Sequence, residues 1–305
     1  MANTAVTQLV FLDDAFPEGR LADSAVPQLF ATDLGATRGD GVFESLLAID
    51  GHARKVAAHL DRLASSARMM DLSMPDPERW RAAIGTGLEA WAAATTAESA
   101  DLPTAVVKLL LTRGVEGSGK PTAWVQVSAV PAAGAIQREK GLDVLLLDRG
   151  YDSELAARAP WLLLGAKTLS YAVNMAALRY AHQQGADDVI FTSADGRVLE
   201  GPTSSVLIAR VETRDGQPVK HLVTPQLDAG ILPGTTQGAL FAAAQQQGWV
   251  LGYGPLVPQD LFQADALWLV SSIRGLAPIR TLDGREVATH AALTAELNSL
   301  FDAIN

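Results

Sequence analysis

The chain has 305 residues, 48% of them hydrophobic, and its 24 basic and 34 acidic side chains give a net charge of −10. This length exceeds what one small core requires and predicts two domains of ordinary size. The acidic balance argues against a general binder of nucleic acid or of anionic membranes, although it allows a local basic pocket for a small anion. The chain contains no cysteine, which excludes disulfides, a thiolate nucleophile and a cysteine zinc site.

Other classes of protein are also disfavoured. No apolar stretch reaches the roughly 18 residues that a membrane-spanning helix needs. The N-terminal MANTAVTQLVFLDD has no basic region followed by a long apolar stretch, so we expect no signal peptide and a soluble, cytoplasmic protein. None of the five histidines pairs with another at i, i+3 or i, i+4 spacing, so we predict no metal site.

The first part of the chain mixes strand-like and helix-like segments. Apolar patterns predict strands at residues 8–12, 41–49, 105–112 and 123–130, and helices at 56–71 and 77–96. The segment PAAGAIQREKG is the expected linker. We therefore expect an N-terminal domain of residues 1–130, a linker of residues 131–141 and a larger C-terminal domain of residues 142–305.

The second part continues the mixture. It predicts strands at residues 142–147, 161–166, 188–192, 206–209 and 266–271, and helices at 170–184, 235–247 and 293–304. Because hairpin-like turns are frequent, the fold class is expected to be α+β and not a regular parallel βαβ series.

Lys167 is the most informative single residue. It follows the apolar run 161–166, which predicts a buried strand, and Ser170 then resembles a helix cap. A lysine at the end of a buried strand loses solvation, which lowers the pKa of its amine. A neutral amine can form a Schiff base with an aldehyde and later move protons. Burial by itself is equally compatible with a lysine that extends its amine to solvent.

The loop GVEGSGK at residues 114–120 nearly matches a phosphate-binding P-loop. The motif needs Ser or Thr after the lysine and must open a helix, but here Pro121 follows and the next segment is strand-like. We therefore predict a hairpin loop between two strands and not a nucleotide hydrolase.

Two segments could bind a phosphate. Gly234 allows close approach of the backbone, and Thr235 and Thr236 open a helix whose N-terminus offers free N–H groups and hydroxyls. Ser272 could add a hydroxyl. Threonines that merely cap the helix, and a serine that merely ends a strand, are the simpler alternatives.

Two charged residues complete the set. Arg62 stands beside the apolar stripe of helix 56–71, with His59 and Ser66 at i, i+3, i+7 spacing, and could meet a phosphate with two hydrogen bonds. Glu200 follows an apolar pair and could point inward, where a carboxylate needs a partner such as a protonated pyridine nitrogen. A solvated arginine and an edge-strand carboxylate are the alternatives.

Taken together, these residues are an amine, a carboxylate, an arginine and a helix start suited to phosphate. Such a set can hold pyridoxal 5'-phosphate (PLP), whose ring then acts as an electron sink.

The chain resembles the fold-type IV PLP enzymes: branched-chain aminotransferases, D-amino acid aminotransferases and 4-amino-4-deoxychorismate lyases. The matching strings occur in the family's order at residues 38–44 (RGDGVFE), 59–63 (HLDRL), 112–114 (TRG), 167–174 (KTLSYAVN), 199–202 (LEGP), 232–236 (LPGTT) and 269–272 (LVSS). The resemblance implies two domains with PLP in the cleft between them, usually in a homodimer.

The resemblance also implies roles for individual residues. Lys167 would be the Schiff-base lysine and proton shuttle, and Glu200 would pair with the pyridine nitrogen. The phosphate would be bound by Arg62, Thr235, Thr236 and Ser272. One departure is Ser205, where many members carry asparagine.

The residues expected to contact substrate follow the family's pattern less closely. Phe43 and Arg113 are expected to contact substrate, and Lys120 could replace the second arginine that lyases carry in this loop. Ser45 stands where lyases tend to have threonine and is the expected proton donor to the departing group.

The strings RGDGVFE and KTLSYAVNMAALR most resemble actinobacterial 4-amino-4-deoxychorismate lyases. The implied reaction gives 4-aminobenzoate and pyruvate, in folate synthesis, from a small substrate that carries an amine and a carboxylate. An aminotransferase for D-alanine, other D-amino acids or branched-chain amino acids is the alternative. A PLP-binding protein without activity is a more distant one, since both the lysine and the carboxylate are present.

Overall fold

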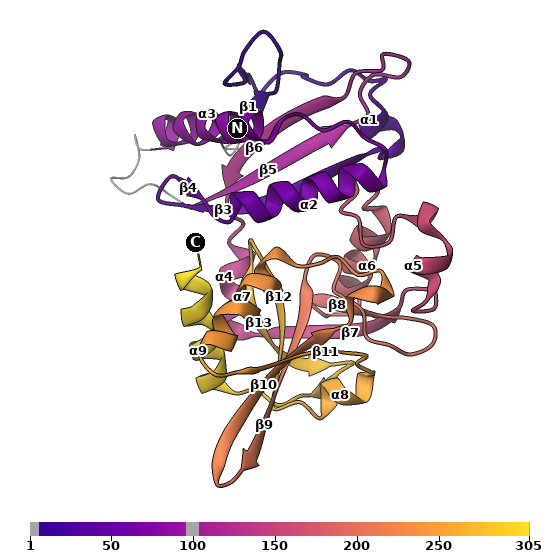
Figure 1. The fold of residues 1–305 in the computed structure, drawn as a ribbon, viewed down its shortest axis with the longest axis vertical. Helices are drawn as coiled ribbons and strands as arrows, with labels where there is room; N and C mark the ends of the chain where they lie inside the picture. The colour runs from indigo at the N-terminus through magenta and orange to yellow at the C-terminus, as the bar shows by residue number, and fades with distance from the viewer. Residues whose placement is uncertain (1–5, 96–103, 305) are drawn as a thin grey trace. The chain divides into compact units, whose positions relative to one another are not determined.

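A computed structural model describes residues 6–95 and 104–304 (Figure 1). The chain divides into two compact units, the first made of Met1–Pro131 and Ala166–Tyr171, the second of Ala132–Gly165 and Ala172–Asn305. The segment that carries Lys167 therefore belongs to the first unit, although it lies within the second half of the sequence. The expected division into an N-terminal domain (residues 1–130), a linker (131–141) and a C-terminal domain (142–305) remains a prediction.

The first unit is built on an antiparallel sheet, six-stranded within the described residues, in the order β2-β1-β6-β5-β3-β4. Its strands are β1 (Thr7–Phe11), β2 (Arg20–Ala22), β3 (Gly41–Ile49), β4 (His52–Ala53), β5 (Ala105–Thr112) and β6 (Thr122–Ala129). Its helices are α1 (Leu34–Arg38), α2 (Val56–Met69) and α3 (Pro77–Thr95). Because β5 and β6 form a plain antiparallel hairpin, the prediction of a hairpin loop at residues 114–120 is confirmed.

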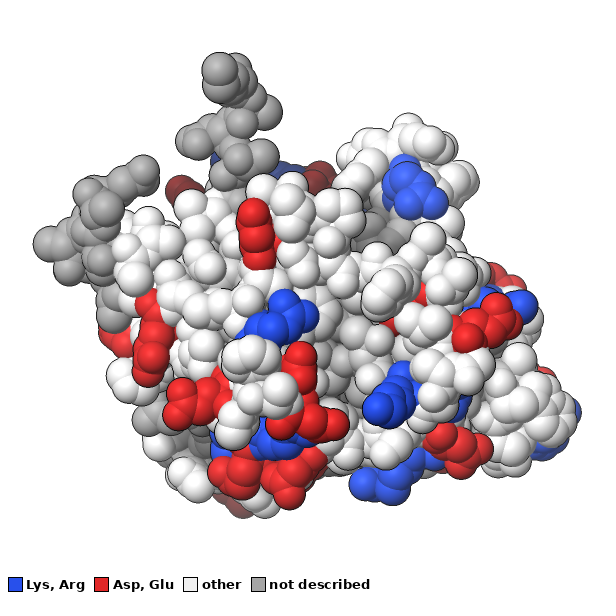
Figure 2. All heavy atoms as spheres, turned by 90° about the horizontal axis from the view of Figure 1, so that it is seen from above, with Lys and Arg blue, Asp and Glu red and all other residues white. Residues whose placement is uncertain are grey.

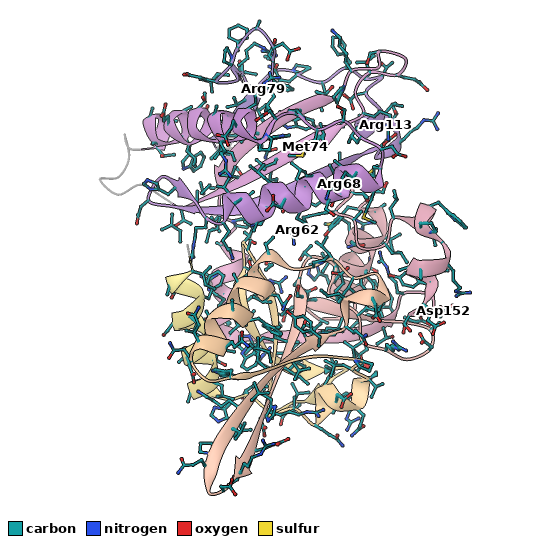
Figure 3. All side chains as sticks on the ribbon, in the orientation of Figure 1. Arg62, Arg68, Met74, Arg79, Arg113 and Asp152 are labelled. Carbon is teal, nitrogen blue, oxygen red and sulfur yellow. The ribbon has the colours of Figure 1, made fainter. Side chains whose placement is uncertain are left out.

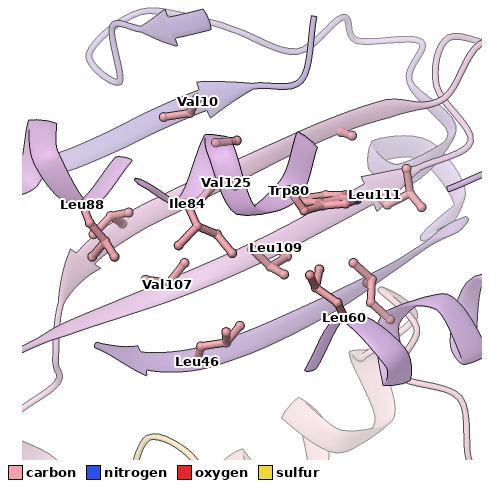
Figure 4. Packing of buried hydrophobic residues seen from close by; sticks show 14 of the residues in the cluster. Val10, Leu46, Leu60, Trp80, Ile84, Leu88, Val107, Leu109, Leu111 and Val125 are labelled. Atoms are coloured by element: carbon pink, nitrogen blue, oxygen red, sulfur yellow. The ribbon is translucent and has the colours of Figure 1, made fainter. Parts of the chain in front are cut away.

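One face of this sheet carries the core, and α2 and α3 cover it (Figures 1 and 4). Alternate residues of the strands, such as Leu46 and Leu109, pack against Leu60 of α2 and Trp80 of α3. Burial of each such side chain contributes about 1.5–3 kcal/mol.

The residues between these core positions point to the opposite side of the sheet. We call this side the Phe43 face and define it by the residues Phe43, Ser45, Lys108, Leu110, Trp124 and Gln126, which are cross-strand partners in two adjacent rows.

The second unit is built on a mixed sheet. Its order within the described residues is β11-β10-β9-β12-β13-β7-β8, with β14 paired to β13. The strands are β7 (Leu142–Asp148), β8 (Asp188–Thr192), β9 (Ser205–Arg214), β10 (Gln217–Pro225), β11 (Val250–Gly254), β12 (Ala266–Ser271), β13 (Gly275–Leu282) and β14 (Arg285–Glu286). The helices are α4 (Ala133–Lys140), α5 (Leu155–Arg158), α6 (Ala172–Gln183), α7 (Thr235–Gln246), α8 (Pro258–Phe262) and α9 (Ala291–Ala303), with short 3₁₀ turns at Pro160–Leu162 and Leu227–Ala229.

Helices cover this sheet in three places. Leu240 of α7 and Leu297 of α9 pack on Trp268 of β12, Leu261 of α8 lies in the cluster that contains Leu267, and Ala181 of α6 packs near Val189 of β8. The packing of α7 on the sheet sets the position of its N-terminus, where the expected phosphate-binding residues Thr235 and Thr236 lie.

Most of the expected elements are confirmed. The strands expected at 41–49, 105–112, 188–192 and 266–271 have these bounds in the structure. The helix expected at 77–96 ends at Thr95, and residue 96 lies outside the described residues. The segment expected as a linker, 131–141, contains α4.

The expected buried strand at 161–166 is wrong. Pro160 opens a 3₁₀ turn, Leu163 and Gly165 have positive φ angles, and Trp161 is 73% exposed. A proline and residues in the left-handed region turn the backbone, so this apolar run cannot extend. The helix expected from Ser170 begins at Ala172, and the Ser170 hydroxyl donates to the carbonyl of Gly39 (3.2 Å).

The surface agrees with the acidic composition. Figure 2 shows one face of the molecule, on which both acidic and basic side chains are exposed and several acidic ones gather at the lower left of the view. None of the helices in the described part of the chain has both the length and the hydropathy to cross a membrane.

Candidate active site

Lys167 lies against the edge of the first unit's sheet. Thr168 forms a β-bridge with Val42, the Phe43 amide donates to the Lys167 carbonyl (3.0 Å), and the Leu169 amide donates to the Gly41 carbonyl (2.7 Å). This pairing makes Lys167 the cross-strand neighbour of Phe43, so both side chains lie on the same side of the sheet.

Two further contacts hold Lys167 in place. The Ser66 hydroxyl, buried on α2, accepts a hydrogen bond from the Lys167 amide (3.0 Å). The Lys167 amine lies 4.4 Å from the centre of the Phe43 ring and 5.6 Å from that of Tyr171, and these two rings meet edge to face. Lys167 is thus fixed at its backbone and bordered by two aromatic rings at its amine. The lowered amine pKa expected from the sequence remains a prediction.

Arg62 belongs to a buried charge network. Its Nε donates to Oε1 of Glu44 (2.7 Å) and its Nη2 donates to Oε2 (2.8 Å), while Nδ1 of His59 lies 2.7 Å from Oε2. Glu44 and His59 are fully buried, and the Arg62 side chain is 13% exposed. Two parallel hydrogen bonds fix the plane of the guanidinium, so its remaining N–H groups have a set direction.

The protonation states of this network follow from its contacts. Burial alone would raise the pKa of Glu44, but hydrogen bonds and charge from Arg62 and His59 lower it to about 2. Burial lowers the pKa of His59 below its ordinary value of 6.5, against the opposing effect of Glu44. Since an ionised carboxylate only accepts, a neutral His59 must carry its proton on Nδ1.

Ser45 and Phe43 lie two residues apart on β3, on the Phe43 face. Ser45 is half-buried and pairs in register with Lys108 of β5. Because Lys167 is the cross-strand neighbour of Phe43, Ser45 is the diagonal neighbour of Lys167. One small molecule could therefore contact both Lys167 and Ser45.

Arg113 and Lys120 are placed differently from these residues. Arg113 donates to both carboxylate oxygens of Asp40 (2.7 and 3.1 Å) and to the carbonyls of Met70 (2.7 Å) and Asp71 (3.2 Å), at the C-terminal end of α2 (Figure 3). These four bonds use four of its five N–H groups. Lys120 is exposed in the β5–β6 loop. Their expected roles in substrate binding are therefore only proposals.

In the second unit, three hydroxyls gather at the N-terminus of α7. The Ser272 hydroxyl lies 2.8 Å from that of Thr236 and 3.4 Å from that of Thr235. Gly234 occupies the cap position and has no side chain to cap the helix. A Cβ at this position would come within 2.4 Å of the Ser205 hydroxyl, so the backbone passes close to β9.

Glu200 is half-buried in the same unit. Its Oε2 accepts a hydrogen bond from the Leu232 amide (3.1 Å), in the loop that leads into α7. Burial raises the pKa of the neighbouring Tyr151, Arg149 opposes this effect, and the charge of Glu200 adds to it. The Arg149 guanidinium also donates to Asn174 (3.0 Å) and lies 4.4 Å from the Phe191 ring centre.

The residues present fit the chemistry of PLP in each unit. The first unit supplies an amine at Lys167 and an oriented guanidinium at Arg62. The second supplies a carboxylate at Glu200 and, at Thr235 and Thr236, a helix N-terminus with hydroxyl donors, which suits a phosphate.

Several residues of this site were not assigned from the sequence. Glu44 and Tyr171 lie inside the matched strings RGDGVFE and KTLSYAVN, which was the available signal. The sequence spacing of His59 and Ser66 relative to Arg62 indicated that the three residues lie on the same flank of helix α2. It did not indicate that His59 contacts Glu44 or that Ser66 contacts Lys167. Arg149 had no sequence signal.

Comparisons with known proteins identify the family of this chain. The model of the family described as amino-transferase class IV matches residues 41–282. The chain is 48% identical over 270 residues, 88% of this chain and 91% of the relative, to the bifunctional aminodeoxychorismate lyase / D-amino acid transaminase of Mycobacterium tuberculosis.

Solved structures give the same result. A hypothetical aminotransferase from Mycobacterium tuberculosis in its PLP-bound form is similar with a TM-score of 0.88 and 44% identity, covering 98% of each chain. A fold IV transaminase from Curtobacterium pusillum has a TM-score of 0.87 and 45% identity, covering 98% of this chain and all of its own. The chain therefore belongs to the class IV aminotransferase family, has the two-domain α+β fold of fold-type IV, and is a PLP-dependent lyase or aminotransferase.

Proposed function

We propose that this protein is a 4-amino-4-deoxychorismate lyase, which converts its substrate to 4-aminobenzoate and pyruvate. The observation that carries the proposal is the 48% identity across most of the Mycobacterium tuberculosis bifunctional enzyme. The position of Ser45 beside Lys167 on the Phe43 face supports it, since elimination needs both a base and a proton donor near the reacting atoms.

The cofactor would be held at three of its functional groups. Lys167 would bind its aldehyde, and Glu200 would pair with its ring nitrogen. Arg62 would take the phosphate together with Thr235, Thr236 and Ser272. When bound, PLP supplies an electron sink that stabilises negative charge on the substrate carbon next to the amine.

The protein's own residues would handle the protons. Lys167 would take the proton from the substrate ring carbon, since its amine is bordered by Phe43 and Tyr171 and its backbone is fixed by Ser66. Ser45 would give a proton to the departing three-carbon group, which leaves as pyruvate. Glu44 would contribute indirectly to cofactor binding, because its carboxylate holds the Arg62 guanidinium in its orientation.

We propose D-amino acid transamination as a second activity of the same site. The same relative is named for both reactions, and D-alanine aminotransferase of Listeria monocytogenes is 28% identical over 88% of this chain. Lys167 would then act first as a base and afterwards as an acid. The alternative of a branched-chain aminotransferase is tested with a branched-chain amino acid as a comparison substrate.

One assay distinguishes the reactions. Purified protein is mixed with 4-amino-4-deoxychorismate without a keto acid, and 4-aminobenzoate is measured. Turnover under these conditions supports the lyase. The transaminase is tested with D-alanine and 2-oxoglutarate, and L-leucine replaces D-alanine to test the branched-chain alternative. No 4-aminobenzoate without a keto acid, with turnover of an amino acid, would reject the lyase proposal.

Assembly and location are also proposals. We expect a homodimer in the cytoplasm that acts on a small molecule carrying an amine and a carboxylate. Light scattering during size-exclusion chromatography tests the dimer, for which a single peak at the mass of one chain is the contrary result.

A further inference from the structure

Lys108 is a basic residue on the Phe43 face that the expected site does not include. It lies on β5 directly opposite Ser45 and directly opposite Gln126 of β6. Its neighbours along β5, Val107 and Leu109, are fully buried on the core side, so the Lys108 side chain stands on the side of Phe43 and Lys167.

The surroundings of Lys108 leave its charge available. The residue is half-buried, and among residues 6–95 and 104–304 it has neither an ion pair nor a hydrogen bond from its amine. A partly buried ammonium group favours an anionic partner, because burial removes part of its hydration. Arg113, by contrast, already donates four hydrogen bonds to Asp40 and to the end of α2.

The spacing between Lys108 and Lys167 bears on the kind of substrate. Lys167 lies opposite Phe43 on one side of β3, and Lys108 lies opposite Ser45 on the other side of β3, in strand β5. The two lysines are therefore separated by two strand spacings across the sheet and by two residues along β3. With ~4.8 Å between strands and ~3.3 Å per residue, their Cα atoms are roughly 12 Å apart. A molecule that reaches from one lysine toward the other must carry its amine and its carboxylate well apart.

We propose that Lys108 binds the ring carboxylate of the substrate and so favours a cyclic amine whose carboxylate stands across the ring. This inference rests on the proposed lyase function. In 4-aminobenzoate and its precursor the amine and the ring carboxylate stand at opposite ends of the ring. In D-alanine both groups are attached to one carbon, so Lys108 has no comparable contact with that carboxylate.

The test compares K108M, which keeps an unbranched apolar side chain, with K108R, which keeps the charge, and K140M, which makes the same change at an exposed lysine of α4. Binding of 4-aminobenzoate and of its neutral analogue 4-aminobenzamide to the PLP-loaded proteins is measured by calorimetry. Turnover of 4-amino-4-deoxychorismate and of D-alanine with 2-oxoglutarate is measured alongside, with PLP content and melting temperature as controls for folding.

We expect K108M to bind 4-aminobenzoate at least about tenfold more weakly, to bind 4-aminobenzamide unchanged, and to raise the KM for aminodeoxychorismate by a similar factor. K108R should recover part of the loss, and K140M and D-alanine turnover should stay within twofold. Unchanged binding of 4-aminobenzoate to folded K108M, or equal losses in both reactions, overturns the proposal. If the wild-type protein makes no 4-aminobenzoate, the lyase function fails. If it does and K108M performs equally, only the role of Lys108 fails.

Discussion

The Phe43 amide donates to the carbonyl of Lys167 at 3.0 Å, and the Lys167 amine lies 4.4 Å from the centre of the Phe43 ring. Residues more than 120 positions apart are thereby direct neighbours in one sheet. The pairing places the Lys167 amine on the same side of the sheet as Ser45, and it explains why the segment Ala166–Tyr171 belongs to the first unit.

Lys167→Ala should lower kcat by at least about 10³-fold, because it removes both the covalent attachment of the cofactor and the proton-transfer group. Borohydride treatment followed by mass spectrometry of peptides checks the attachment. The wild type should carry a fixed cofactor on Lys167 and the variant none. Lys140→Ala serves as the matched control and should behave as wild type. A fixed cofactor on another lysine of the wild type would remove Lys167 from its proposed role.

Glu44→Gln should destabilise the fold and weaken binding of the phosphate group of PLP. It leaves Arg62 without its buried counter-charge, a change that costs about 3–5 kcal/mol. Chemical denaturation measures the loss, with Glu139→Gln on exposed α4 as a control expected within about 0.5 kcal/mol of wild type.

The same variant tests the orientation of Arg62. Glu44→Gln should reduce affinity for PLP more than affinity for pyridoxal, which lacks the phosphate. Equal losses for the two ligands would mean that Glu44 stabilises the fold without directing Arg62 at a phosphate.

Stability should fall in acid because of this network. The folded chain keeps Glu44 ionised down to a pKa of about 2, whereas the unfolded chain takes up a proton near the ordinary value of 4.5. Its contribution, about 3 kcal/mol, is therefore complete above pH 4.5 and is lost as the pH falls toward 2. His59 acts in the same direction below about pH 6.5, since burial lowers its pKa and the unfolded chain binds the proton first.

Unfolding free energies measured from pH 7 to pH 3 check this. The wild type should lose more stability than Glu44→Gln over the range, because the variant has no carboxylate to protonate. Parallel curves for the two proteins contradict the assignment.

Ser45→Ala should slow single-turnover elimination by about 10²-fold, while Ser45→Thr, which keeps a hydroxyl, should stay close to wild type. Quenched-flow detection of 4-aminobenzoate measures the step directly. An unchanged rate in the alanine variant removes Ser45 from the mechanism.

Thr236→Val should weaken PLP binding and leave pyridoxal binding nearly unchanged, because it removes a hydroxyl donor at the N-terminus of α7. Loss of the 2.8 Å contact with Ser272 should also lower stability by about 1 kcal/mol. Spectroscopic titration of the cofactor-free protein gives both affinities. Thr213→Val, at an exposed position of β9, is the control. A variant that binds both ligands as tightly as wild type argues against a phosphate at this helix.

Sequence patterns predicted much of the fold where local signals are strong. The strand 41–49 runs up to an Asp50-Gly51 turn signal, and the helix beginning at Thr235 follows Pro233 and Gly234, so both were located well. The apolar run 161–166 misled the prediction, because hydrophobicity does not reveal that Pro160 and Gly165 turn the chain there. The strands β10, β11 and β13 were missed, since short or Gly/Pro-interrupted strands depend on their neighbours for stability.

The sequence by itself determined the family and the cofactor chemistry, because short motifs and their order along the chain can be read without a structure. It also predicted Lys167, Glu200 and the threonines of α7 as residues that bind the cofactor. Only the tertiary structure decided which side chains meet. Arg62 is oriented by Glu44, Arg113 is occupied by Asp40, and Lys108 shares a sheet face with Lys167. The physical reason is that strand register and burial, which set these contacts, join residues far apart in the chain, and no local pattern encodes such a pairing.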